Sequence, residues 1–326
     1  MLRAIYGRPG QGPVEASTEA EIATFFKERQ GCLWVDLESP SDAERGILER
    51  VFAFHRLAIE NCLLQSNHPR IDDYGDYFYL VVHGVTSTGA GTLQGEARIR
   101  LREIDAFLGE HVLVTYHAGT NTSIPAVRQK CAEVERLMSR GPDRVLAEIL
   151  DHVAEEYMTV MENLDSEIDT LEDRLFRHAS KPALREIFSL KKDVLRLRRV
   201  VNPQREVLNR LARAEHKAVS KEETIYFRDV YDHIYRVAEM LESFRDVLSS
   251  SLEVYLTVVA NRTNEVMKVL TVFSIILMTA SFLAGLYGMN VHLPGAESKA
   301  SFYILLGVMA TFSCALLIFF RKRRWI

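Results

Sequence analysis

The sequence predicts an α+β membrane protein, in which an α/β domain and long helices precede two C-terminal transmembrane helices. No charged residue occurs from Leu270 to Tyr287, and a second apolar run extends from Phe302 to Phe320. Each run is about as long as a helix must be to cross a bilayer. Upstream, β-branched and aromatic runs alternate with helical patterns, and sustained helical periodicity begins near Asp143.

Length and composition argue against several classes of protein. The 326 residues allow two or more domains, and the net charge of −4 argues against nucleic acid as a partner. There is no HExxH or GxSxG motif, so we expect neither an enzyme nor a bound cofactor. Met1 to Gly12 contains no apolar run, and no signal peptide is expected. Four widely spaced cysteines indicate reduced thiols rather than disulfides or a zinc site, namely Cys32, Cys62, Cys131 and Cys314.

Residues 1–140 are predicted to form a cytosolic α/β domain, because strand and helix patterns are interleaved there. Each expected helix begins at a Ser or Thr that can act as N-cap and has an acidic residue in its first turn. The expected helices are Thr18–Arg29 and Ser41–Phe54, and the expected strands are Leu2–Tyr6, Leu33–Leu37, Tyr77–Val85, Ala97–Leu108 and His111–Tyr116.

Residues 141–220 are predicted to form a long helical hairpin, because two sustained apolar stripes flank Ser180-Lys181-Pro182. A basic cluster on the second helix can pair with an acidic set on the first, and a metal site among these acids is a further possibility. The basic residues are Lys191, Lys192, Arg196, Arg198 and Arg199; the acidic ones are Glu155, Glu156, Glu162, Asp165, Glu167 and Asp169.

Residues 221–265 are predicted to form a stalk helix that continues into the membrane domain, residues 266–326. One side of this helix has an apolar seam, which we interpret as a contact between subunits, made of Val230, Ile234, Val237, Leu241, Phe244 and Leu248. Another side has a cytosolic acidic stripe, which alternatively is an ordinary solvated face, made of Asp232, Glu239, Asp246 and Glu253.

The first apolar run also carries a regular stripe of polar and thioether side chains. Its members are three or four residues apart and therefore share one helical face: Asn264, Met267, Thr271, Ser274, Met278 and Ser281. Small residues of this kind also mediate helix–helix packing in membranes. Because the stripe continues the acidic one, we favour a pore lining. Two helices cannot enclose a water-filled path, so several copies would surround a common axis.

These segments resemble the signature of a known family. The run YxxxxANRxNEVMKVLT begins at Tyr255, and AGLYGMN ends at Asn290. Together with Tyr226–His233 and Glu242–Asp246, they are similar to the CorA family of divalent-cation channels. The resemblance implies a homopentameric funnel, in which a cytosolic α/β domain and a stalk helix lead into the first membrane helix. Two departures are Thr279, where family members have a proline, and the loop with His292, which replaces MPEL.

The resemblance also implies roles for individual residues. The pore mouth would be Gly288, Met289 and Asn290, where amide and carbonyl oxygens hold the water shell of a hydrated cation. A basic ring would follow the second span, formed by Arg321, Lys322, Arg323 and Arg324.

Asp229 matches one acid of the family's regulatory metal site between cytosolic domains. The partner acid would lie near residues 85–91, but that segment contains no carboxylate. A single carboxylate binds Mg²⁺ weakly. Weak inhibition by internal Mg²⁺, or inhibition through other acids such as Asp232, is therefore expected, and Asp229→Ala should change it only modestly.

Charge predicts the topology. The basic tail follows the second span directly, whereas the loop between the spans contains only Glu297 and Lys299. The positive-inside rule then places both termini in the cytosol of a multi-pass inner-membrane protein. The first span covers about residues 268–287, the outer loop 288–300 and the second span 301–320.

We interpret the protein as a channel for Mg²⁺, with Co²⁺ or Ni²⁺ as other possible ions, whose partners are copies of itself, the membrane and the metal ions. One alternative is a Zn²⁺ transporter coupled to protons, as in the ZntB-like branch of the same superfamily. The intact GMN favours the magnesium branch, whereas the altered loop and the missing proline weaken that interpretation. A second alternative is a membrane-anchored scaffold or sensor that transports nothing.

Overall fold

The computed structural model describes residues 1–64, 68–87, 98–119, 122–177, 179–289, 299–323 and 325. The chain divides into two compact units. The first unit comprises Met1–Asp173 with Arg185–Ser250, and the second comprises Arg174–Leu184 with Ser251–Ile326. Of the predicted site residues, Asn290 and Arg324 lie outside the described residues.

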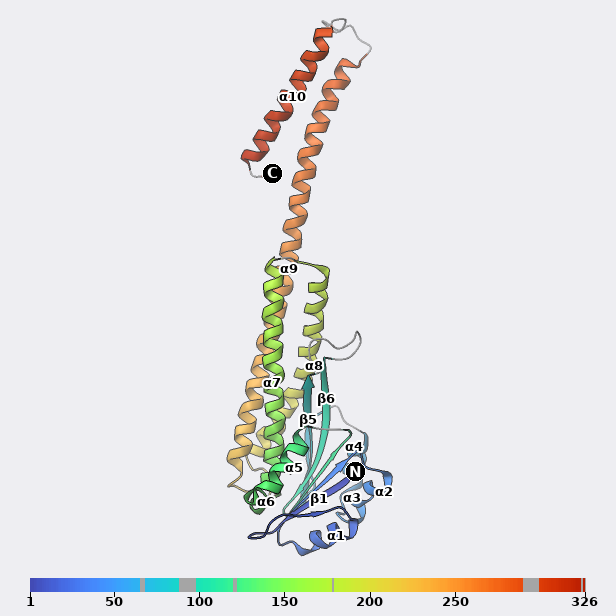
Figure 1. Ribbon diagram of the computed structural model, residues 1–326, viewed down its shortest axis with the longest axis vertical. Helices are drawn as coiled ribbons and strands as arrows, with labels where there is room; N and C mark the ends of the chain where they lie inside the picture. Colours follow the sequence, from blue (N-terminus) through green and yellow to red (C-terminus); the bar gives the residue numbers. More distant parts are fainter. Residues whose placement is uncertain are drawn as a thin grey trace. The chain divides into compact units, whose positions relative to one another are not determined.

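The described elements follow the predicted order of an α/β region, long helices and two apolar helices (Figure 1). The strands are β1 (Leu2–Gly7), β2 (Val14–Ala16), β3 (Cys32–Glu38), β4 (Arg70–Asp73), β5 (Tyr77–Ser87), β6 (Ile99–Gly109) and β7 (Val112–His117). The helices are α1 (Glu19–Glu28), α2 (Asp42–Arg45), α3 (Ile47–Arg50), α4 (Arg56–Leu64), α5 (Ser123–Glu133), α6 (Glu135–Arg140), α7 (Pro142–Arg177), α8 (Lys181–Ala212), α9 (Thr224–Tyr287) and α10 (Lys299–Lys322).

Within the described residues, the strands form one sheet in the order β2-β1-β3-β7-β6-β5-β4. Strands β3 and β7 pair in parallel, and the other neighbours are antiparallel. All six residues of β7 are buried, which is expected for a central strand covered on both faces. All five predicted strands are confirmed, whereas β2 and β4 were not predicted and lie at the two edges.

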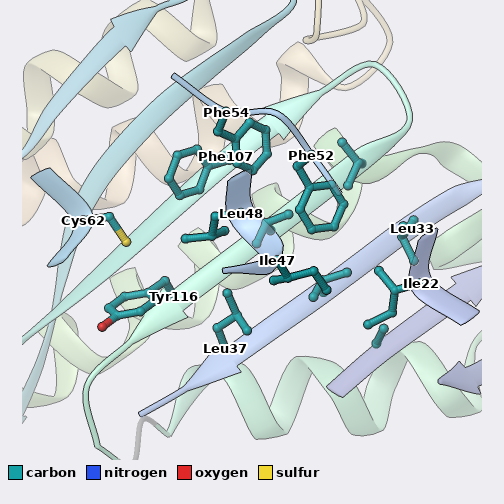
Figure 2. Close-up of a cluster of buried hydrophobic side chains, with 14 of the residues drawn as sticks. Ile22, Leu33, Leu37, Ile47, Leu48, Phe52, Phe54, Cys62, Phe107 and Tyr116 are labelled. Carbon is teal, nitrogen blue, oxygen red and sulfur yellow. The ribbon is translucent and has the colours of Figure 1, made fainter. Parts of the chain in front are cut away.

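Helices α1, α3 and α4, with the segment that follows α3, supply one hydrophobic core against the sheet (Figure 2). Phe54 stacks on Phe107 of β6 with ring centroids 4.4 Å apart. The predicted N-caps are confirmed, because Thr18 and Ser41 each form a capping box with a glutamate three residues later. The second predicted helix is wrong as one piece, since it divides into α2 and α3 at Gly46.

The apolar seam of α9 packs inside the chain. Ile234, Val237 and Leu248 are no more than 1% exposed in a single chain. Helices α7 and α8 run beside this part of α9 (Figure 1), and Lys191 of α8 donates a hydrogen bond to Ser249 of α9 at 3.3 Å. The interpretation of this seam as a contact between subunits is therefore wrong, because the chain's own hairpin already covers it.

A buried polar network joins β3 to β7. Asp36 accepts a hydrogen bond from Thr115 Oγ1 at 2.8 Å and lies 3.3 Å from His117 Nε2. The Arg128 guanidinium also donates to the Asp36 carboxylate. Burial alone lowers the pKa of His117, but the contact with the Asp36 carboxylate outweighs burial, so the pKa of His117 is raised.

This raised pKa predicts that the stability of the protein depends on pH. The imidazolium form is favoured by folding, so its contribution is fully present below the ordinary histidine pKa and is lost as pH rises through the raised value. The wild-type melting temperature should therefore fall as pH rises above the ordinary histidine pKa of about 6.5, and His117→Gln should reduce this dependence. His111→Gln, at a half-exposed histidine, is the control. The same pH dependence in wild type and His117→Gln would contradict the assignment.

Candidate metal-ion pathway and metal centre

The six polar and thioether residues of the predicted pore lining lie on one exposed face of α9. Asn264, Thr271, Ser274 and Ser281 are exposed, and Met267 and Met278 are 58% and 68% exposed. Val272, on a different face of the same helix, is 1% exposed. Apolar side chains of the same segment are as exposed as the stripe, with Phe273 at 64% and Leu277 at 63%, so exposure in a single chain does not distinguish the stripe from the rest of the span.

The stripe is polar without being charged. Thr271 Oγ1 donates to the carbonyl of Met267 at 2.8 Å, so its proton is used while its oxygen can still accept a hydrogen bond. No carboxylate occurs between Leu270 and Tyr287. Such a surface can hydrogen-bond to the water shell of a cation but cannot replace that shell with charged ligands.

Helix α9 and helix α10 are the two described helices that are long and apolar enough to cross a membrane. Helix α9 ends at Tyr287, where Gly288 N donates to the carbonyl of Ala284 at 3.0 Å. Gly288 and Met289 thus follow the end of the first apolar span, and Asn290, the third residue of the predicted mouth, lies outside the described residues. Arg321, Lys322 and Arg323 are exposed at the end of α10.

The acidic stripe of the stalk is exposed along its whole length. Asp232, Glu239, Asp246 and Glu253 all face solvent in the single chain. Asp246 Oδ1 accepts two hydrogen bonds from the neighbouring Arg245, at 2.9 and 2.7 Å. Its negative charge is therefore partly compensated.

Asp229 belongs to a cluster that joins two helices. One ligand atom each from Asp229 and His233 of α9 and Asp151 of α7 lie within 4.8 Å of one another. His233 Nδ1 is 3.6 Å from Asp151 Oδ1 and has no hydrogen-bond partner among the described residues. Two carboxylates and an imidazole are ligands suited to a divalent cation.

The electrostatics of this cluster favour a cation. Burial and the nearby carboxylates of Glu155 and Asp229 raise the pKa of Asp151, although His233 lowers it. A bound divalent ion would relieve this repulsion. The second acidic group, which combines Asp151 with Glu148 and His152, is less suited, since Glu148 already pairs with Lys130 and with Arg144 at 3.0 Å.

Asp229 was predicted from the sequence, whereas Asp151 and His233 were not. The predicted place of the partner acid was residues 85–91, of which 88–91 lie outside the described residues. Asp151 stands one turn before Glu155, the first member of the acidic set predicted on α7. The acidic set on α7 was the sequence feature that could have indicated a metal ligand there. The sequence alone, however, does not show which turn of α7 faces Asp229.

Comparisons with known proteins identify relatives along the whole chain. The family described as CorA-like Mg2+ transporter protein matches residues 29–322. The chain is 32% identical to the Bacillus subtilis protein YfjQ over 314 residues, which are 96% of this chain and 93% of that one. It is 29% identical over 316 residues to the cobalt/magnesium transport protein CorA of Thermotoga maritima, covering 95% of this chain and 88% of that protein.

A solved structure confirms the fold class. The complete structure of the CorA magnesium transporter from Methanocaldococcus jannaschii superimposes with a TM-score of 0.83 at 21% identity. The match covers 100% of this chain and 99% of that chain. The combination of an α/β region, a helical stalk and two C-terminal apolar helices is therefore a known architecture.

Proposed function

The chain belongs to the CorA-like Mg2+ transporter family, and we propose that it conducts Mg²⁺ across the inner membrane through a homopentameric pore. Members of this family transport divalent cations in the inner membrane and are not enzymes. Co²⁺ and Ni²⁺ are further proposed substrates, because relatives include a cobalt/magnesium transport protein.

The observation that carries this proposal is the regular polar stripe of α9. Four of its six members lie within the apolar span and two lie just before it, and water or protein must cover such polar groups at membrane depth. A ring of copies around one axis covers the stripe with both water and protein, since the stripes of neighbouring subunits then enclose a hydrated path. Family membership supports five copies.

Along this path the ion keeps its water. We assign Gly288, Met289 and Asn290 to the outer mouth, Asn264 to a lower ring, and the stripe hydroxyls to the stretch between them. Mg²⁺ gives up water reluctantly, and an uncharged lining leaves its shell in place. Met267 and Met278 form apolar constrictions that close by losing water.

We assign a regulatory cation to Asp151, Asp229 and His233. Each residue supplies one ligand atom, and the three atoms lie within 4.8 Å of one another. The carboxylates suit Mg²⁺, and the imidazole adds affinity for transition metals such as Co²⁺ and Ni²⁺. Occupancy of this site at high internal Mg²⁺ favours the closed pore, and the acidic stripe attracts cations to the cytosolic entrance.

We also assign both termini to the cytosol. The basic residues at the end of α10 outnumber the two charges of the loop between the spans, which supports this orientation under the positive-inside rule. Residues 288–300 then face outward.

Ion flux into liposomes tests the proposal. Liposomes that contain the purified protein should take up Mg²⁺, with Co²⁺ or Ni²⁺ as further substrates. An inward proton gradient should leave the rate of Mg²⁺ uptake unchanged. Empty liposomes and liposomes containing heat-denatured protein are the controls. Zn²⁺ uptake that rises with the proton gradient would support the zinc alternative instead. Absence of flux for every ion in correctly assembled protein would support a scaffold or sensor.

A further inference from the structure

A cleft of about 370 Å³ lies in the second unit, between the tip of the α7–α8 hairpin and α9. Arg177 and Ala179 line it on the hairpin side. The α9 side contributes about two turns of helix: Val258, Val259, Asn261, Arg262 and Glu265. The cleft thus combines two guanidinium groups and an amide with small apolar side chains.

The cleft lies close to the membrane surface. Arg262 is eight residues before Leu270, where the charge-free span begins, and this spacing is about 12 Å along a helix. The headgroup layer extends roughly 5–8 Å beyond the hydrocarbon core, and an arginine side chain bridges the remaining gap toward it.

The cleft also faces away from the proposed pore. Arg262 is two residues from Asn264, which corresponds to about 200° around the helix. A side chain in this direction reaches the outer surface of an assembly in which Asn264 faces the axis. The cleft is therefore open to lipid rather than to the ion path.

The cleft carries a net positive charge, because its lining contains two arginines and one glutamate. Arg177 and Arg262 are exposed, and neither forms an ion pair within the part of the chain that the structure describes. Glu265 is the one carboxylate in the lining, and it lies one turn nearer the membrane than Arg262. Arg177 also stands in the last turn of α7, where a basic side chain complements the helix dipole, so a test must separate that structural role from binding.

We propose that this cleft binds the headgroup of an anionic phospholipid of the inner leaflet, one per subunit. Arg177 and Arg262 bind the phosphate, Asn261 supplies an additional hydrogen-bond donor, and Val258 and Val259 contact the glycerol and upper acyl carbons. Two guanidinium groups are well suited to phosphate, and basic residues at the cytosolic membrane surface attract anionic lipids. Glu265 opposes the headgroup charge and limits the affinity.

Native mass spectrometry of the full-length protein, titrated with phosphatidylglycerol or phosphatidylcholine, tests the proposal without requiring ion flux. Arg177→Ala with Arg262→Ala should weaken phosphatidylglycerol binding about 30-fold, since each basic residue near an anionic surface contributes about fivefold. Phosphatidylcholine, in which the choline cation offsets the phosphate charge, should bind wild type more weakly and lose less affinity in this variant. Arg213→Ala removes an exposed arginine of the first unit and should leave both lipids unaffected.

Glu265→Gln should change the affinity for phosphatidylglycerol in the opposite direction. Removing this carboxylate should tighten phosphatidylglycerol binding severalfold, which a role of Arg177 at the helix end does not predict. This variant also carries the test if the double arginine variant fails to assemble. The proposal is overturned if Glu265→Gln binds no more tightly than wild type, or if the double variant keeps wild-type affinity. Displacement of the lipid by millimolar inorganic phosphate would likewise overturn it and assign the cleft to a soluble anion.

Discussion

Replacing Asn290 by alanine is expected to abolish Mg²⁺ flux while leaving the assembled protein intact. In the proposed mouth, a ring of Asn290 amide oxygens accepts hydrogen bonds from the water shell of the entering ion. Alanine removes every acceptor of the ring at once, because each subunit carries the same change. The hydrated cation then loses the hydrogen bonds that would hold its water shell where the ion enters the mouth from bulk water.

The measurement is ion uptake into liposomes together with size-exclusion chromatography of the purified protein. Asn209→Ala, at a half-buried position of α8 in the other compact unit, is the matched control and should conduct normally. Asn290→Gln keeps the amide but moves its oxygen by one methylene, and we expect an intermediate rate. Wild-type flux in Asn290→Ala would disprove the assignment of the mouth.

The second large effect is expected at the candidate metal centre. Asp229→Ala, Asp151→Ala and the double substitution should each raise the internal Mg²⁺ concentration needed for inhibition by about tenfold or more, since affinity depends on the number of charged ligands. The single and double variants should resemble one another because both residues belong to one site. This differs from the modest effect of Asp229→Ala that the sequence suggested, since Asp151 and His233 are the proposed partners of Asp229.

Flux measured against internal Mg²⁺ gives the inhibition curve, and calorimetry of the purified protein gives cation binding directly. Asp169→Ala removes the same charge from an exposed position of α7, 18 residues and about 27 Å beyond Asp151 along the helix, and should not alter either curve. If Asp151→Ala and Asp169→Ala give the same inhibition curve, Asp151 is not a ligand of the regulatory cation.

The sequence predicts the central strands and the long helices because burial leaves a strong pattern there. Strands β3 and β7 lie between neighbours and are buried along nearly their whole lengths. Strands β2 and β4 contain only three and four residues at the sheet edges, where little burial is required and the sequence is free to be polar. Helix α4 was also missed, because only Ala58 and Cys62 of its nine residues are buried.

For the site, periodicity alone locates the stripe on α9 but not the partners of Asp229. A stripe is a property of one helix and follows from spacing in the sequence. The approach of Asp151 to Asp229 depends on how α7 is rotated and shifted against α9, which is decided by the packing of many apolar side chains together. The seam on α9 was misassigned for the same reason, since its pattern does not reveal which helix covers it.

The burial of that seam bears on how the protein is made. Val230, Ile234 and Leu241 are buried within one chain, and α7 and α8 run beside this part of α9 (Figure 1). The hydrophobic core of the first unit is therefore buried without any neighbouring copy. Newly synthesised subunits can then complete this core on their own after leaving the ribosome. In the proposed assembly, neighbouring subunits would then meet through surfaces that are already folded, so its formation depends on subunit concentration in the membrane.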